Sequence, residues 1–263
     1  MPDITTAQIG RFCWFELSTT DQNAAKVFYS TLFGWTIRDF AMGEYGVYTF
    51  FERNGRDAGA CATLQPEQAA QGIPPYWLTY VGVTSVDDTL AKVAALGGTV
   101  IMPGMDVFDS GRFGILQDPT GAMIGLWQAK NHHGVGVIRE SNTFGWSELL
   151  TNDTAAATKF YTGLFGWDTL VSEGMGMPYT HWRLNDEDFG GMMAIMPEMG
   201  PIPPNWMNYV QVDDCDACVE KATSLGGTVC SPPMDIPEVG RFAVLQDPQG
   251  ATFAIIKLVP MHK

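Results

Sequence analysis

The alternation of apolar and polar residues predicts short strands with a few helices between them. Phe12–Ser18 is aromatic and apolar apart from one acid, as expected of a largely buried strand. Asp21 can cap the amino end of a helix that runs to Phe33, and Gly34 supplies the left-handed residue that ends it. Short strands with a helix on one face are typical of an α+β fold.

The remainder of the first half predicts further strands and one more helix. Strands are expected at about 35–39, 46–52 and 58–64, then at 77–83, 99–102, 112–117 and 123–128, with a helix over 86–96. The order β-α-β-β-β therefore occurs twice. We expect the sheet face opposite the helices to be concave, and we call this face a cup.

The chain contains the same domain twice. FCWFELSTTDQNAAKVFYSTLFGW at 12–35 returns as FGWSELLTNDTAAATKFYTGLFGW at 144–167, and GRFGILQDPTGA at 111–122 returns as GRFAVLQDPQGA at 240–251. The repeat predicts one domain at 1–129 and a second at 143–263. The polar, Gly-containing segment 130–142 is predicted to be a linker.

Charge and composition narrow the classes of partner. Fifteen Lys and Arg stand against 29 Asp and Glu, a net charge of −14 that repels nucleic-acid phosphates and anionic lipids. No apolar run approaches the ~20 residues that span a bilayer, the amino-terminal residues show no secretory pattern, and five cysteines form no disulfide framework. We expect a reduced, cytoplasmic protein with a small-molecule ligand or substrate, no nucleic acid and no membrane; a homodimer stays open.

The order of the motifs resembles the vicinal oxygen chelate superfamily, which includes glyoxalase I, bleomycin-resistance proteins, fosfomycin-resistance enzymes and extradiol dioxygenases. The motifs that carry the resemblance recur in both halves, and in the first they are Asp21, Phe28-Tyr29, Phe33-Gly34-Trp35, Gly97-Gly98 and Asp118-Pro119-x-Gly121. The resemblance implies an α+β fold of two tandem glyoxalase-like domains, each with two βαβββ modules around a concave sheet cup. The most similar subgroup is that of two-domain glyoxalase-like proteins often labelled hydroxylases.

The resemblance also implies where metal ligands would lie, and this chain departs from it there. The first-, fifth- and last-strand ligand positions of the family fall in the two copies on Trp14, Leu78, Gly125, Trp146, Met207 and Ala254. A divalent hard or borderline metal ion needs three or four nitrogen or oxygen donors, which these side chains do not supply. We therefore expect no metal at these positions and no other cofactor.

Side-chain alternation along the strands predicts the lining of each cup. The expected first cup holds Phe12, Trp14, Glu16, Leu78, Tyr80, Met123, Gly125 and Trp127. The expected second cup holds Phe144, Trp146, Glu148, Met207, Tyr209, Ala254 and Ile256. Aromatic and apolar walls with a carboxyl and a phenol are typical of a small-molecule site. The alternative is that the aromatic rings fill a packed core.

Glu16 and Glu148 are the candidate catalytic groups. A carboxyl on an apolar face has a raised pKa, which suits a general acid or base near neutral pH. His181 occupies the position of Phe50, where it either substitutes for a packing residue or adds a base to the second cup alone. The alternative is that each glutamate is a structural group, hydrogen-bonded to tyrosine, arginine or backbone.

Other polar groups are expected to be structural. Cys215 and Cys218 begin a helix and are expected to pack, the adjacent His132 and His133 lack further donors for a metal, and the acidic run 186–188 is expected to be a solvated turn. Two arginines, Arg112 and Arg241, are expected to pair with Asp118 and Asp247; the alternative is that they attract an acidic ligand at the rim of the cup.

Three functions are compatible with these features. The first is binding of an apolar or aromatic molecule that stacks on Trp14 or Trp146. The second is a metal-independent glyoxalase- or hydroxylase-like enzyme that uses a cup glutamate as general acid or base. The third is a structural or partner-binding module with filled cups.

Overall fold

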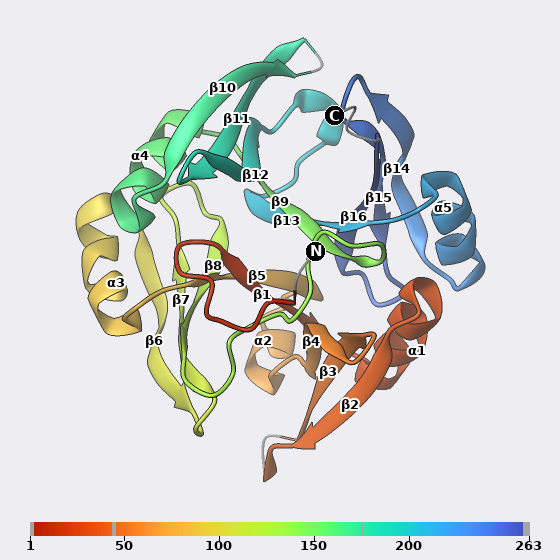
Figure 1. The fold of residues 1–263 in the computed structure, drawn as a ribbon, viewed down its shortest axis with the longest axis horizontal. Helices are drawn as coiled ribbons and strands as arrows, with labels where there is room; N and C mark the ends of the chain where they lie inside the picture. Colours follow the sequence, from red (N-terminus) through yellow and green to blue (C-terminus); the bar gives the residue numbers. More distant parts are fainter. Residues whose placement is uncertain (1–2, 44–45, 175, 260–263) are drawn as a thin grey trace.

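The computed structural model describes residues 3–43, 46–174 and 176–259, which form two similar domains (Figure 1). The first domain contains β1 (Phe12–Thr19), α1 (Gln22–Phe33), β2 (Thr36–Ala41), β3 (Val47–Arg53), β4 (Arg56–Thr63), α2 (Pro66–Ala70), β5 (Tyr76–Gly82), α3 (Val86–Val93), the 3₁₀ turn η2 (Ala94–Leu96), β6 (Thr99–Val107), β7 (Gly111–Gln117) and β8 (Met123–Ala129). The second contains β9 (Thr143–Thr151), α4 (Thr154–Phe165), β10 (Asp168–Gly174), β11 (Met177–Leu184), β12 (Glu187–Ala194), the 3₁₀ turn η3 (Pro197–Met199), β13 (Asn205–Gln211), α5 (Cys215–Ser224), β14 (Thr228–Ile236), β15 (Gly240–Gln246) and β16 (Thr252–Leu258).

The helix ends follow from the residues that the sequence places there. Asp21 Oδ1 accepts a hydrogen bond from Ala24 N at 2.9 Å, and Asp153 does the same for Ala156 N in the second domain. Gly34 ends α1 with a φ of 69°, in the left-handed region, which glycine adopts without a steric clash because it has no Cβ. The short helix α2 was not predicted from the sequence.

Each domain is one mixed sheet with its helices on one face. The strand order is β2-β3-β4-β1-β5-β8-β7-β6 in the first domain and β10-β11-β12-β9-β13-β16-β15-β14 in the second. In each module the first and last strands pair in parallel, and β1 joins the two modules by pairing with β5 in the antiparallel sense. The predicted α+β fold of two tandem domains, each made of two βαβββ modules, is confirmed. Figure 1 shows both sheets curled, so each has a concave face.

The domains pack through the faces opposite the cups. The Phe15 and Phe144 rings stack with centroids 4.2 Å apart, and Thr79 Oγ1 donates to Asn208 Oδ1 at 2.7 Å. Neighbouring residues on a strand point to opposite faces, so Trp14 and Glu16 lie on the other side of the sheet from Phe15. The two cups therefore face away from each other.

Phe12 and Phe144 belong to this interdomain core, so their predicted place in the cups is wrong. The β1–β5 register shifts between Phe12 and Trp14, and β9 shifts in the same way after Phe144. A bulge adds one residue and reverses which face the preceding side chain points to. The Phe12 ring consequently lies 5.2 Å from the Trp206 ring of the second domain, while Phe144 lies 5.1 Å from Trp77.

The repeated family motifs also join the domains. Tyr29 OH donates to Asp247 Oδ2 at 2.9 Å, and Tyr161 OH donates to Asp118 Oδ2 at 2.9 Å. The other carboxylate oxygen of Asp118 accepts from the amides of its own turn. The predicted pairing of these aspartates with arginines is wrong.

The arginines pair instead with the first turn of the helix that precedes their strand in the same module, α3 for Arg112 and α5 for Arg241. Arg112 forms a two-point contact with Asp87 at 3.0 Å, and Arg241 binds Asp216 at 2.8 and 2.9 Å. Both aspartates lie near the surface, where an arginine reaches them more easily than it reaches the buried Asp118 and Asp247. Among the described residues, no helix is long and apolar enough to cross a membrane.

Candidate functional site

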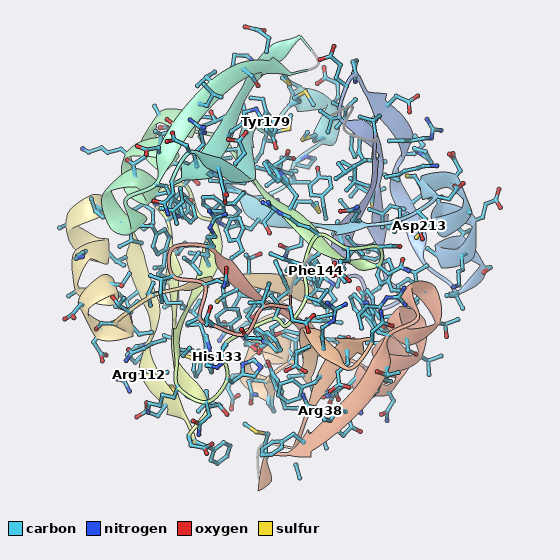
Figure 2. All side chains as sticks on the ribbon, viewed as in Figure 1. Arg38, Arg112, His133, Phe144, Tyr179 and Asp213 are labelled. Atoms are coloured by element: carbon cyan, nitrogen blue, oxygen red, sulfur yellow. The ribbon has the colours of Figure 1, made fainter. Side chains whose placement is uncertain are left out.

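Strand register brings the predicted cup residues together. In the first cup Trp14 pairs with Tyr80 and Glu16 with Leu78, and in the second Trp146 pairs with Tyr209 and Glu148 with Met207. Tyr80 and Tyr209 in turn pair with the last strand of their domain, at Gly125 and Ala254. Figure 2 places the side chains on the ribbon.

In the first cup, Glu16 accepts hydrogen bonds from two phenols. Tyr80 OH donates to Glu16 Oε1 at 3.2 Å, and Tyr48 OH donates to Glu16 Oε2 at 2.5 Å. The same Tyr48 oxygen accepts the indole N–H of Trp14 at 2.9 Å. One continuous network therefore links the stacking surface to the carboxyl.

The second cup repeats this network. Tyr209 OH donates to Glu148 Oε1 at 3.1 Å, Tyr179 also hydrogen-bonds Glu148, and Tyr179 OH accepts from Trp146 Nε1 at 2.9 Å. The sequence analysis missed Tyr48 and Tyr179. Period-two alternation on the same strands was the signal for both, since they lie two residues before Phe50 and His181.

Burial dominates the acidity of both carboxyls. Loss of water raises the pKa of Glu16 and of Glu148, and the phenol donors, which favour the charged form, only partly oppose it. The pKa values of Tyr179 and Tyr209 are raised for the same reason and by the neighbouring carboxylate. A carboxyl with a raised pKa can hold a proton and donate it, to a ligand oxygen or to a reacting group.

Gly191 makes room for Tyr179 in the second cup. It lies directly opposite Glu148 on β12, and a Cβ added there would stand 1.9 Å from Tyr179 Oη. The matching residue opposite Glu16 is Ala60. The phenol of Tyr179 therefore occupies space that, at the matching position of the first domain, belongs to the methyl group of Ala60.

His181 lies beside this second network. Its ring centroid is 5.1 Å from that of Tyr179 and 6.4 Å from that of Trp146. Nδ1 is 3.1 Å from Asp188 Oδ2, and Nε2 is 2.8 Å from Ser172 Oγ. Asp188 is therefore part of the site rather than of a solvated turn, whereas the side chain of its neighbour Asp186 is 98% exposed.

The first cup has a histidine as well, which comes from the segment between the domains. The His132 ring packs edge-on against Trp14, with centroids 4.6 Å apart, and against Trp127 at 5.9 Å. His132 Nε2 lies 3.2 Å from Asp57 Oδ2, and Trp127 Nε1 donates to the His132 carbonyl at 2.9 Å. The sequence analysis considered His132 only as a metal ligand, because contact over more than 100 residues leaves no local signal.

Apolar side chains line the second cup as a cluster of their own. Leu150, Met207, Tyr209, Ala254 and Ile256 are its buried members, with the half-buried Trp146, Met193, Ile195, Met199, Ile202, Phe242 and Val244 against them. Trp146 keeps part of its surface exposed, whereas its counterpart Trp14 is 5% exposed. The first-cup residues Trp14, Leu78, Tyr80 and Trp127 belong instead to the main core.

Cys215 and Cys218 are packing residues, as predicted. Cys215 is buried at the start of α5, and burial raises its pKa to about 11. The pKa of Cys218 is raised by the same cause to about 12. Neither thiol is activated as a nucleophile.

The donor set does not fit the divalent ion of metal-using relatives. At the positions where the resemblance implies ligands, the cups present an indole, aliphatic and thioether side chains, and glycine or alanine. The described part of the chain contains no group of three or more His, Cys, Asp or Glu side chains placed to hold a metal ion.

This fold and these paired cups define a class of protein. Residues 11–126 and 143–255 match the glyoxalase/bleomycin resistance protein/dioxygenase superfamily, also known as the vicinal oxygen chelate superfamily, and the chain belongs to it.

Two relatives are similar along nearly the whole chain. "Putative glyoxylase CFP32" of Mycobacterium tuberculosis is 43% identical over 264 residues, which cover 100% of both chains. "Anthracycline biosynthesis protein DauV" of Streptomyces sp. (strain C5) is 33% identical over 259 residues, covering 95% of this chain and 94% of DauV.

Solved structures share the fold at low identity. The Mn(II)-bound glyoxalase of Novosphingobium aromaticivorans is similar with a TM-score of 0.65 and 15% identity, covering 95% of this chain and 83% of that one. The 2,2',3-trihydroxybiphenyl 1,2-dioxygenase of Sphingomonas wittichii strain RW1 gives a TM-score of 0.64 and 13% identity, covering 95% and 92%. These likenesses concern the fold alone.

Proposed function

We propose that this protein binds an aromatic small molecule in the second cup, without a metal ion at the positions that the family uses. The observation that carries the proposal is the separate apolar cluster on that face, with Trp146 partly exposed above it. Covering such surface with a ligand gains roughly 25 cal/mol for each Å² of apolar area removed from water. A flat aromatic ligand suits the indole face of Trp146.

The polar groups beside the cluster would orient the ligand. Glu148 is 7% exposed and sits among Tyr179, Tyr209 and the indole N–H of Trp146. Its raised pKa favours a protonated carboxyl that can donate to a hydroxyl or carbonyl oxygen of the ligand. The name of DauV refers to anthracycline biosynthesis, and anthracyclines are polycyclic aromatic compounds with such oxygens.

The duplication supplies a matched test. Titration calorimetry with 1,4-dihydroxyanthraquinone should give binding to the wild-type chain that Trp146→Ala weakens by roughly 30-fold, because stacking and apolar contact are lost. Trp14→Ala should change the affinity by less than about threefold. Circular dichroism checks that both variants fold. Equal losses in the two variants, or no binding of any aromatic compound, would overturn the proposal.

A second candidate function is metal-independent catalysis in the same cup. It is favoured by the histidine, since His181 contacts Asp188 beside a network that ends on Glu148. In this function Glu148 would act as general acid or base. Glu148→Gln should then retain ligand binding and abolish turnover. If Glu148→Gln lowers affinity and no turnover is found with the wild-type chain, the glutamate serves binding alone.

A further inference from the structure

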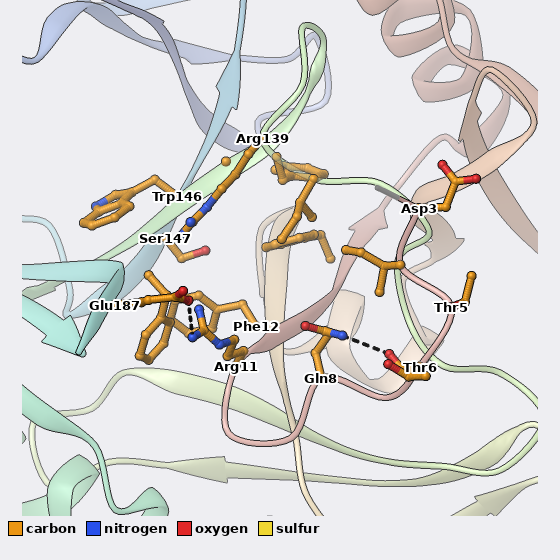
Figure 3. A pocket seen from close by; sticks show the side chains of 16 residues that line it. Asp3, Thr5, Thr6, Gln8, Arg11, Phe12, Arg139, Trp146, Ser147 and Glu187 are labelled. Atoms are coloured by element: carbon orange, nitrogen blue, oxygen red, sulfur yellow. Dashed lines mark hydrogen bonds and ion pairs between the residues drawn. The ribbon is translucent and has the colours of Figure 1, made fainter. Parts of the chain in front are cut away.

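A cavity lies between the two domains, and Trp146 of the second cup borders it. Its volume is about 400 Å³, within the range of small-molecule pockets. Figure 3 shows it from close by, with the amino-terminal segment on one side and β9 and β12 of the second domain on the other. Both domains contribute to its wall.

Five aromatic residues, one of them Trp146, contribute to the wall of this interdomain cavity. Phe12, Phe15, Phe144 and Phe189 line it, and all four are buried. The isoleucines Ile4 and Ile138 add aliphatic surface. This wall suits the aromatic or aliphatic body of a small molecule.

The charged part of the wall contains two arginines, Arg11 and Arg139, and two carboxylates, Asp3 and Glu187. Arg11 donates to Glu187 Oε2 at 2.6 Å, and Asp3 accepts from Arg56 at 2.9 Å, so these two carboxylates have partners. The guanidinium of Arg139 makes one hydrogen bond, from Nη2 to the Asp188 carbonyl at 3.0 Å, and no described carboxylate lies within 4.0 Å of it. Burial and the charge of Arg11 lower the pKa of Arg139, and the charges of Glu187 and Asp188 only partly oppose this.

The backbone holds Arg139 in an unusual conformation. Its φ is 58°, in the left-handed region that a long side chain rarely adopts. The Arg139 N–H donates to the Phe144 carbonyl at 2.9 Å, which ties the turn to the start of β9. A conformation of this kind is strained for a residue other than glycine and persists because the surrounding contacts fix it.

We propose that the interdomain cavity binds an organic carboxylate with an aromatic body. The carboxylate would pair with the guanidinium of Arg139, whose planar fork matches two oxygens, and the body would lie against Phe12 and Phe144. Because the whole chain carries a net charge of −14, an anion is repelled by most of the surface. Binding of a carboxylate therefore requires a local site of this kind. The proposal does not rest on the ligand of the second cup: Trp146 borders both sites, whereas Glu148 does not line this cavity.

Benzoate and its neutral isostere benzamide form the first test, on the wild-type chain. Ligand-observed NMR should show saturable binding of benzoate, and at least tenfold weaker binding of benzamide, because the charge-assisted hydrogen bonds are lost. Equal binding of the two compounds, or binding of neither, would overturn the proposal. This comparison needs no variant to fold.

Variants locate the site. Arg139→Gln should weaken benzoate binding by about tenfold or more, whereas Lys92→Gln, which removes an equal charge on the exposed face of α3, should not change it. Glu148→Gln should also leave benzoate binding unchanged, which separates this cavity from the second cup. Loss of benzoate binding in Glu148→Gln but not in Arg139→Gln would contradict the assignment.

Discussion

The two cups share one hydrogen-bond network and differ in which side chains pack over it. Each has a tryptophan whose indole N–H reaches a tyrosine, and a glutamate between two phenols. In the first cup His132 packs over this network, with its ring centroid 4.6 Å from that of Trp14. Among the residues that the structure describes, no ring from outside the second sheet packs on Trp146, and the His181 ring of the same sheet lies 6.4 Å away.

Equivalent aspartates show how the cups have diverged. Asp57 and Asp188 occupy matching positions at the start of the fourth strand of each domain, and each contacts an imidazole. In the first domain that imidazole comes from the interdomain segment and closes the cup. In the second it comes from β11 and lies in the sheet itself. Asp57 thus helps to hold the histidine that closes the first cup, whereas Asp188 contacts the histidine that adds a base to the second cup.

Removing the cover should open the first cup. His132→Ala loses the edge-on contacts with Trp14 and Trp127 and the contact with Asp57, so the free energy of unfolding should fall by about 2 kcal/mol. Calorimetry with 1,4-dihydroxyanthraquinone should then detect a second bound molecule per chain. Thermal unfolding and the binding stoichiometry measure the two effects.

The neighbouring His133, which is exposed, provides the control. His133→Ala should change neither stability nor stoichiometry. If His132→Ala leaves the stoichiometry at one, the first cup is closed by its own packing and not by the interdomain segment.

A single methyl group should disturb the second cup. Gly191→Ala places a Cβ where Tyr179 Oη lies, so the phenol must move away from Glu148 and Trp146. We expect roughly tenfold weaker binding of the aromatic ligand, since the polar network that orients it is broken. Calorimetry measures the loss. Ala60→Gly, the reverse change in the first domain, should leave binding unaltered, and unchanged affinity in Gly191→Ala would argue against a role of Tyr179.

The pH dependence of stability should reveal the buried carboxyl. Folding raises the pKa of Glu148. As the pH rises, the carboxyl therefore keeps its proton longer in the folded chain than in the unfolded chain. The stabilisation is complete below the ordinary glutamate pKa and is lost as the pH rises through the folded pKa, at up to about 1.4 kcal/mol for each pH unit in that interval. Urea unfolding of wild-type protein and Glu148→Gln between pH 4 and 8 should show a flatter profile for the variant, by roughly 1 kcal/mol. Parallel profiles would show that Glu148 has an ordinary pKa.

Much of the fold was predictable because its signals are local. Asp21 and Asp153 cap their helices, Gly34 and Gly166 end them, and strand alternation gave nearly every strand to within a few residues. The internal repeat extended each assignment to the second half. The same alternation brought Trp14, Glu16 and Tyr80 onto one face.

The remainder depends on contacts that sequence periodicity does not contain. A one-residue bulge sends Phe12 to the interdomain core, and alternation counted back from Trp14 does not detect it. His132 reaches Trp14 across the sequence of a whole domain, and Arg139 acquires its place only when the two domains meet. The lack of a carboxylate partner for the Arg139 guanidinium, and the packing of His132 over the first cup, are properties of the tertiary structure.

A crystal structure of the chain soaked with 1,4-dihydroxyanthraquinone tests the central claim most directly, because it locates the ligand in one cup or the other. We predict one molecule in the second cup, stacked on Trp146 with an oxygen within hydrogen-bond distance of Glu148 or Tyr209, and none in the first cup beneath His132. Ligand density in the first cup alone, or in neither cup at saturating concentration, would contradict the account.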